Sequence, residues 1–202
     1  YVQFFTPQGH ALAQALPLRE LIFARQKLRL LAELRELDAK DRITPILAAL
    51  FERAAFGDLV VEHPDSDEAR PLAGLARSFG NALRPALRKA GLLTAQPDAN
   101  LPRLHVCFLA GDHVLLASGH PRDSSPWPSG IPRLRTPPDA PSRSALKLDE
   151  AFLVLLDADE RARWLKPGMR AADLGAAPGG WTWVLTRHGL KVTAIDNGPL
   201  RQ

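Results

Sequence analysis

A glycine-rich turn with acidic residues on both sides is the part of the sequence best suited to bind a small molecule. The run from Asp173 to Trp181 (DLGAAPGGW) contains three glycines, and Asp196 follows it. Glycine lets a backbone turn sharply and approach a ligand closely. The GxxxGG spacing differs from the GxGxxG and Walker patterns, and Pro178 has no N–H to offer a pyrophosphate. The turn therefore favours a ligand without phosphate.

Asp196 completes the candidate site. It follows the predicted strand 191–195 (KVTAI), and an acid at the end of such a strand can accept hydrogen bonds from both hydroxyls of a ribose. Turn and acid together fit S-adenosylmethionine, with Asp173 near its ammonium group and the loop backbone against its methionine portion. Two alternatives are a purely structural strand-to-helix turn and an NAD-binding oxidoreductase, although the glycine spacing fits the latter badly.

The elements that must position these residues form a βαβ unit. Residues 169–174 and 191–195 are predicted strands, and residues 179–186 begin a helix between them. In open α/β sheets, ligands bind at the carboxyl ends of the strands, which is where the turn lies. A further helix precedes the unit, with Ser142 as its cap and an apolar stripe made of Ala145, Leu148, Phe152 and Leu155.

The first 120 residues predict a second set of mixed elements. Residues 1–6 resemble a strand, and residues 12–37 carry apolar residues at near-helical spacing. The order that follows is helix, strand, helix, helix, strand, strand, over residues 41–56, 58–63, 71–79, 82–90, 104–109 and 113–118. The last two strands join in a tight hairpin at Gly111-Asp112. The fold class is α/β.

A proline-rich segment separates the two sets. Seven prolines fall within residues 121–141, and such a density allows neither a helix nor a central strand. We expect an extended, stiff connector, with Trp127 and Ile131 pinning it to a neighbouring surface.

The charge pattern is compatible with a polyanionic partner. The chain has 26 basic and 22 acidic residues, a net charge of +4. Residues 70–103 hold six basic residues and one acid, so they form either an ordinary solvated surface or a phosphate-contacting one. The six are Arg70, Arg77, Arg84, Arg88, Lys89 and Arg103.

Several classes of protein are disfavoured. The longest apolar runs are far shorter than the roughly 20 residues of a membrane span. The single cysteine, Cys107, has apolar neighbours, which predicts a buried strand residue and a reducing, cytoplasmic location. The histidines lack metal-ligand spacing, so we expect no metal.

The glycine turn and the helix before it resemble a known family. DLGAAPGGW, preceded by residues 140–152 (APSRSALKLDEAF), is similar to the Rossmann-type ribose 2′-O-methyltransferases of the FtsJ/RrmJ class. Residues 21–26 (LIFARQ), 41–45 (DRITP) and 130–134 (GIPRL) narrow the resemblance to bacterial enzymes that methylate a cytidine of 23S ribosomal RNA. The similarity covers essentially all 202 residues.

The resemblance implies four parts. Residues 1–40 would be the remainder of an N-terminal ferredoxin-like domain, and residues 41–120 a THUMP RNA-binding domain. Residues 121–141 would link them to residues 142–202, a truncated Rossmann-like methyltransferase domain. The implied partner is 23S ribosomal RNA, the implied cofactor S-adenosyl-L-methionine, and the expected state a monomer. The alternative is a non-catalytic RNA-binding protein with a degenerate methyltransferase fold.

Roles for single residues also follow from the resemblance. Lys147 matches the first lysine of the family's Lys-Asp-Lys-Glu tetrad and is the catalytic candidate, whereas the other three members cannot be assigned. We therefore expect the chain alone not to methylate RNA. The cofactor-binding candidates are Ser144, Asp173, Gly175, Ala177, Pro178, Gly179, Gly180 and Asp196.

Overall fold

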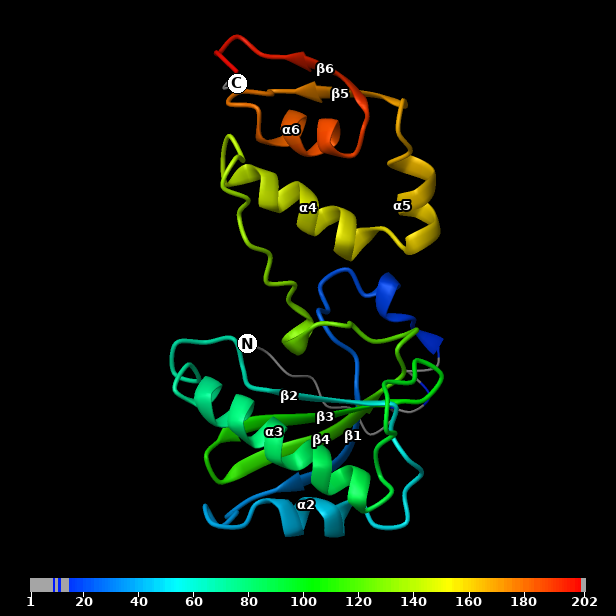
Figure 1. The fold of residues 1–202 in the computed structure, drawn as a ribbon, viewed down its shortest axis with the longest axis vertical. Helices are drawn as coiled ribbons and strands as arrows, with labels where there is room; N and C mark the ends of the chain where they lie inside the picture. Colours follow the sequence, from blue (N-terminus) through cyan, green and yellow to red (C-terminus); the bar gives the residue numbers. More distant parts are fainter. Residues whose placement is uncertain (1–8, 10, 12–14, 201–202) are drawn as a thin grey trace. The chain divides into compact units, whose positions relative to one another are not determined.

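The chain forms two compact units. The computed structural model describes residues 9, 11 and 15–200, and it divides into Tyr1–Ile131 (unit 1) and Pro132–Gln202 (unit 2) (Figure 1). Both units combine helices with a sheet, which confirms the α/β class. The strand predicted over residues 1–6 lies outside the described residues.

Unit 1 is built on a four-stranded sheet with two helices on one face (Figure 1). The sheet order is β1-β4-β3-β2; β2 runs parallel to β3, and the other neighbours are antiparallel. The strands are β1 (Arg29–Leu34), β2 (Asp58–Glu62), β3 (Arg103–Ala110) and β4 (His113–Gly119), and the helices are α2 (Ile43–Ala49) and α3 (Leu72–Lys89). The β3–β4 hairpin forms where the sequence predicts it.

Helix α3 corrects one prediction. The sequence predicts two short helices, over residues 71–79 and 82–90, yet the structure has one continuous helix with Pro85 inside it. Its buried side chains recur at helical spacing across the expected break: Ala76, Phe79, Leu83 and Leu87. Packing of this uninterrupted stripe on the sheet outweighs the local cost of proline.

Two other predicted helices also differ. The helix expected over residues 41–56 ends at Ala49, because Leu50 leaves helical geometry and Glu52 adopts a left-handed backbone with φ at 64°. The helical spacing of residues 12–37 does not extend over the whole range: the described part contains one helical residue, Ala15, then a 3-10 turn, η1 (Leu18–Glu20), and strand β1. Pairing with β4 determines the conformation of β1, a tertiary effect that local spacing does not reveal.

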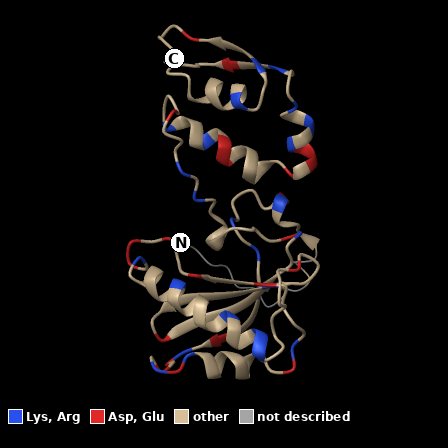
Figure 2. Cartoon of the chain, viewed as in Figure 1, with Lys and Arg blue, Asp and Glu red and all other residues tan. Residues whose placement is uncertain are grey.

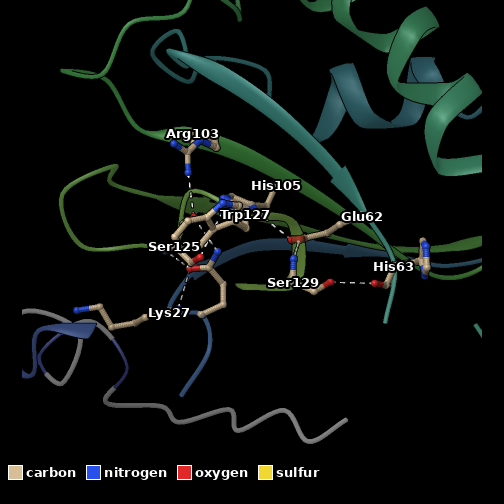
Figure 3. Close-up of polar contacts among 9 residues, drawn as sticks. Lys27, Glu62, His63, Arg103, His105, Ser125, Trp127 and Ser129 are labelled. Atoms are coloured by element: carbon tan, nitrogen blue, oxygen red, sulfur yellow. Dashed lines mark hydrogen bonds and ion pairs between the residues drawn. The ribbon is translucent and has the colours of Figure 1, made fainter. Parts of the chain in front are cut away.

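The second face of the sheet is covered by the first half of the proline-rich segment. Ser124, Ser125 and Gly130 are buried, and the short 3-10 helix η2 (Pro128–Gly130) lies beside β2. The Ser129 amide donates to the Glu62 carboxylate, whose other oxygen lies 3.0 Å from Nδ1 of the buried His105 (Figure 3). Residues 120–131 therefore belong to unit 1 and pack on its sheet.

Unit 2 contains the predicted βαβ arrangement. Strands β5 (Arg170–Leu174) and β6 (Lys191–Ile195) are parallel, and α6 (Gly180–Arg187) connects them and packs on one face. Helix α4 (Ser144–Leu155) packs on α6. Helix α5 (Ala158–Trp164) is not among the predicted elements; it begins with a capping box between Asp157 and Glu160.

Candidate functional site

The glycine turn lies at the carboxyl end of β5, as the sequence predicts. Gly175 follows the strand with φ at 80°, and Gly179 precedes α6 with φ at 106°. Both angles fall in the left-handed region, where a side chain would be strained. The space where a Cβ of Gly175 would lie is open, so the backbone there is accessible to a ligand.

Asp196 is joined directly to this turn. Its Oδ2 accepts a hydrogen bond of 2.8 Å from the Ala177 amide, and its Oδ1 accepts one of 2.7 Å from the Gly198 amide. These two backbone donors lower the pKa of the exposed Asp196 carboxyl below its ordinary value. A carboxylate oxygen can accept more than one hydrogen bond, so both oxygens retain capacity for hydroxyl groups.

Asp173 takes a different position. It is buried, and the Thr182 hydroxyl donates to its Oδ2 at 2.6 Å. Because the partner belongs to α6, the carboxylate is held between the end of β5 and the first turn of that helix. The two acids that the sequence singles out thus reach the same end of the sheet, one buried beneath the turn and one exposed beside it.

The start of α4 is packed tightly against the start of α6. A Cβ built on Gly180 would lie 2.3 Å from Ser144 Oγ and 2.5 Å from Ser142 Oγ, so only glycine permits this approach. The Trp181 indole donates to the Ser144 carbonyl at 3.1 Å, a second tie between the helices. Lys147 lies one turn further along α4 and is exposed.

The N-terminal cap predicted for α4 is wrong. The N-cap residue is Arg143, whose side chain makes no capping bond, while Ser142 Oγ, one residue earlier, accepts a hydrogen bond of 3.3 Å from the Ser144 amide. Ser142 Oγ lies 2.5 Å from Ser144 Oγ, so this hydroxyl is used to join the two serines at the contact with α6. The sequence does not predict the contacts of Trp181 and Thr182, although both residues directly follow the glycines, where a helix is predicted to begin.

Six basic residues lie within residues 70–103 of unit 1, where Figure 2 draws Lys and Arg in blue, and only some of the six are available to a ligand. Arg84 pairs with Asp58 at 2.8 Å, and Arg70 pairs with Asp67 at 2.6 Å. Arg88 and Arg103 donate to backbone carbonyls of Thr94 and Ser125. The remaining two, Arg77 and Lys89, are exposed on α3.

Cys107 is buried in β3, as predicted. Burial raises the pKa of its thiol to about 12, and the nearby Glu62 charge adds to the rise. In the part of the chain that the structure describes, no group of three or more His, Cys, Asp or Glu residues could hold a metal ion. No helix among the described residues has the length and apolar character to cross a membrane.

Comparison with known proteins finds two family models that match this chain. Residues 140–201 match the model of the FtsJ-like methyltransferases, so unit 2 carries a methyltransferase-type fold. Residues 41–119 match the model of the N-terminal part of ribosomal RNA large subunit methyltransferase M. The chain is thus similar to the FtsJ-like methyltransferases in the first of these ranges and to ribosomal RNA large subunit methyltransferase M in the second.

Relatives of that name share most of the sequence. The chain is 70% identical over 202 residues to the one from Xanthomonas campestris pv. campestris (strain B100) and 69% identical over 202 residues to that of Xanthomonas axonopodis pv. citri (strain 306). Each match covers 100% of this chain and 58% of the relative. The chain thus spans little more than half the length of these relatives.

Proposed function

We propose that this chain takes part in the S-adenosylmethionine-dependent 2′-O-methylation of a cytidine ribose in 23S ribosomal RNA, in the cytoplasm. The observation that carries the proposal is the junction between Asp196 and the glycine turn. A carboxylate suited to a ribose diol is held by the amide of Ala177 in the same turn that leaves backbone accessible at Gly175.

The residues present fit the proposed cofactor. Asp196 would accept hydrogen bonds from the ribose hydroxyls, and the backbone at Gly175 and Ala177 would lie against the methionine portion. The Asp173 side chain, fixed by Thr182, is proposed to lie near the ammonium group. Pro178, Gly179 and Gly180 shape the turn and its contact with Ser144. When bound, S-adenosylmethionine supplies an electrophilic methyl group on a positively charged sulfur.

Lys147 is proposed as the catalytic residue of this chain. A ribose hydroxyl is a poor nucleophile, and transfer of a methyl group needs in-line approach, so positioning contributes strongly to the rate. The exposed ammonium of Lys147 would hold the hydroxyl oxygen of the substrate. The Trp181 and Gly180 contacts with Ser144 fix the helix turn that carries it.

The proposal also assigns a function to each part of the chain. Residues 41–120 would be a THUMP domain that binds RNA, and residues 142–202 the cofactor-binding part. Residues 1–40 would be the remainder of a ferredoxin-like domain, although β1 (Arg29–Leu34) pairs with β4 in the sheet of unit 1.

Titration calorimetry tests the cofactor assignment. We expect the chain to bind S-adenosylmethionine but not NADH, and we expect Asp196→Ala to abolish measurable binding. Asp159→Ala is the matched control, because Asp159 is an exposed carboxylate of unit 2 on α5, and it should bind as the unchanged chain does. Equal binding by the Asp196→Ala variant would refute the role of this carboxylate.

A genetic experiment tests the RNA substrate. Deleting the gene that encodes the chain should remove one 2′-O-methylcytidine from 23S ribosomal RNA, detected by mass spectrometry of nuclease fragments. Re-expression should restore the modification. An unchanged set of 2′-O-methyl groups in the deletion strain would rule out the proposed activity.

A further inference from the structure

We propose that the turn carrying Ile22 and Phe23 is a stacking platform for an unpaired base of the RNA. This inference rests on the proposed function, because it assigns a contact for the RNA substrate. It concerns unit 1 alone and a segment far in sequence from the basic stretch on α3.

Ile22 and Phe23 are displayed to solvent at the tip of a tight turn. Their exposed fractions are 86% and 98%, the highest among the exposed large apolar side chains of the described residues. The Ala24 amide donates to the Leu21 carbonyl at 2.9 Å and closes the turn. A phenylalanine gains much by burial, so one held fully in water is available to a partner.

The base of this turn is held by hydrogen bonds to the proline-rich segment. The Gln26 side chain makes two bonds with the Ser125 backbone: its Nε2 donates to the carbonyl at 3.2 Å, and its Oε1 accepts from the amide at 2.9 Å. Asp123 accepts from the Leu18 amide at 2.7 Å and pairs with the Lys27 ammonium. The turn is thus fixed at both ends.

Close backbone packing adds to this support. Gly130 has φ at 67°, and a Cβ there would lie 1.9 Å from the Arg25 carbonyl oxygen. The backbone two residues after Phe23 therefore lies directly on a buried glycine. Because the support is rigid, a partner that meets Phe23 need not order the turn first.

The charge around the turn favours a polyanion. Residues 18–29 contain four basic residues and one acid, and Asp123 from the proline-rich segment offsets the charge of Lys27. Arg25 and Arg29 are exposed, as is Phe23, which stands between Arg19 and Arg25 in the sequence. Aromatic rings beside arginines bind single-stranded RNA, because the ring stacks on a base while the guanidinium groups contact phosphates.

A second exposed phenylalanine shows which features matter. Phe51 is 75% exposed and, like Phe23, is followed two residues later by an arginine, Arg53. Glu52 stands between them, so the local charge is balanced. This pair lacks the basic surroundings of the Phe23 turn and serves as an internal control.

Fluorescence anisotropy with this chain separates stacking from charge attraction. The probes are a labelled single-stranded oligocytidine and an abasic strand of the same length, which keeps the phosphates and lacks the bases. Phe23→Ala should weaken binding of oligocytidine by about 5- to 150-fold and leave the abasic strand unaffected. Phe23→Trp should retain binding, and its fluorescence should change when oligocytidine is added.

Two control variants complete the design. Phe51→Ala should bind both strands as the unchanged chain does. Arg25→Gln should weaken binding of both strands, and the log–log dependence of affinity on salt should become shallower by about 0.7 for each phosphate that Arg25 neutralises. Circular dichroism melting should be unchanged by Phe23→Ala, because the side chain is fully exposed.

Three results would overturn the inference. If the Phe23→Ala and Phe51→Ala variants bind oligocytidine equally well, Phe23 stacks on no base. If Phe23→Ala instead dissociates an oligomer in sedimentation experiments, the turn is a protein contact. If the chain binds S-adenosylmethionine but neither strand, RNA binding by unit 1 is refuted while the cofactor assignment stands. If only the weakening by Phe23→Ala is absent, the stacking proposal fails and the proposed function is unaffected.

Discussion

Substituting Gly180 by alanine tests the tight contact between α4 and α6. The added Cβ would lie 2.3 Å from Ser144 Oγ, 2.5 Å from Ser142 Oγ and 3.1 Å from the Ala145 amide nitrogen. The two hydroxyl oxygens carry most of the conflict, because the amide nitrogen would have to move by only a few tenths of an ångström. The variant therefore has to displace these hydroxyls, and with them the first turn of α4, from the glycine turn.

The magnitude follows from two opposing effects. Overpacking of a closely packed contact costs about 1–3 kcal/mol. Replacing glycine by alanine in a helix recovers at most about 1 kcal/mol, and less at the first helical residue. We expect a net loss of about 1–2 kcal/mol in the free energy of unfolding of unit 2.

Urea denaturation followed by tryptophan fluorescence measures this loss. Trp164, Trp181 and Trp183 lie in unit 2 and only Trp127 in unit 1, so the signal reports mainly on the affected unit. Adding Ser142→Ala and Ser144→Ala to the variant removes both hydroxyls and should recover most of the stability. Gly74→Ala is the control, because nothing lies within 4 Å of the new methyl group on α3.

The reasoning would be refuted in either of two ways. A Gly180→Ala variant as stable as the unchanged chain would show that the helices yield without cost. A loss of stability that persists after both serines are replaced would show that the hydroxyls are not the atoms in conflict.

Two further predictions concern titrating groups. The Cys107 thiol should resist iodoacetamide in the folded chain and react in denaturant at about pH 8.5, the ordinary thiol pKa. Because folding raises the pKa of this thiol, the free energy of unfolding should fall as the pH rises above about 8.5. Rapid labelling of the folded chain would contradict the burial of Cys107. The Asp196 carboxyl should titrate below its ordinary pKa in carbon-detected NMR, so its stabilising effect is present above about pH 4 and is lost as the pH falls through the folded value. Replacing Gly198 by proline should remove one donor and raise that pKa, and an unchanged value would exclude the Gly198 amide as a cause.

The βαβ unit could be predicted because its signals are local. Strand β6 (Lys191–Ile195) has the predicted bounds, and the glycine turn falls where a strand ends and a helix begins. The β3–β4 hairpin is equally local, since Gly111-Asp112 marks the turn between two apolar runs. In each case a few neighbouring residues determine the backbone.

The features that were missed depend on contacts between distant segments. Strand β1 is set by pairing with β4, where Leu34 lies opposite Val114, and helical spacing within residues 12–37 gives no sign of this pairing. The serine pair at the start of α4 is explained only by the approach of Gly180. The support of the Phe23 turn by Gln26 and Ser125 also links segments that the sequence places far apart.

The pairing of β5 with β6 has a practical consequence for handling the protein. Parallel strands are usually covered on both faces, yet here α6 covers one face while Leu174 and Ile195 are 75% and 56% exposed. Unpaired backbone N–H and C=O groups of an edge strand can pair with strands of other chains, and exposed leucine and isoleucine side chains beside them favour this association. Concentrated solutions of these 202 residues should consequently be prone to aggregate through unit 2.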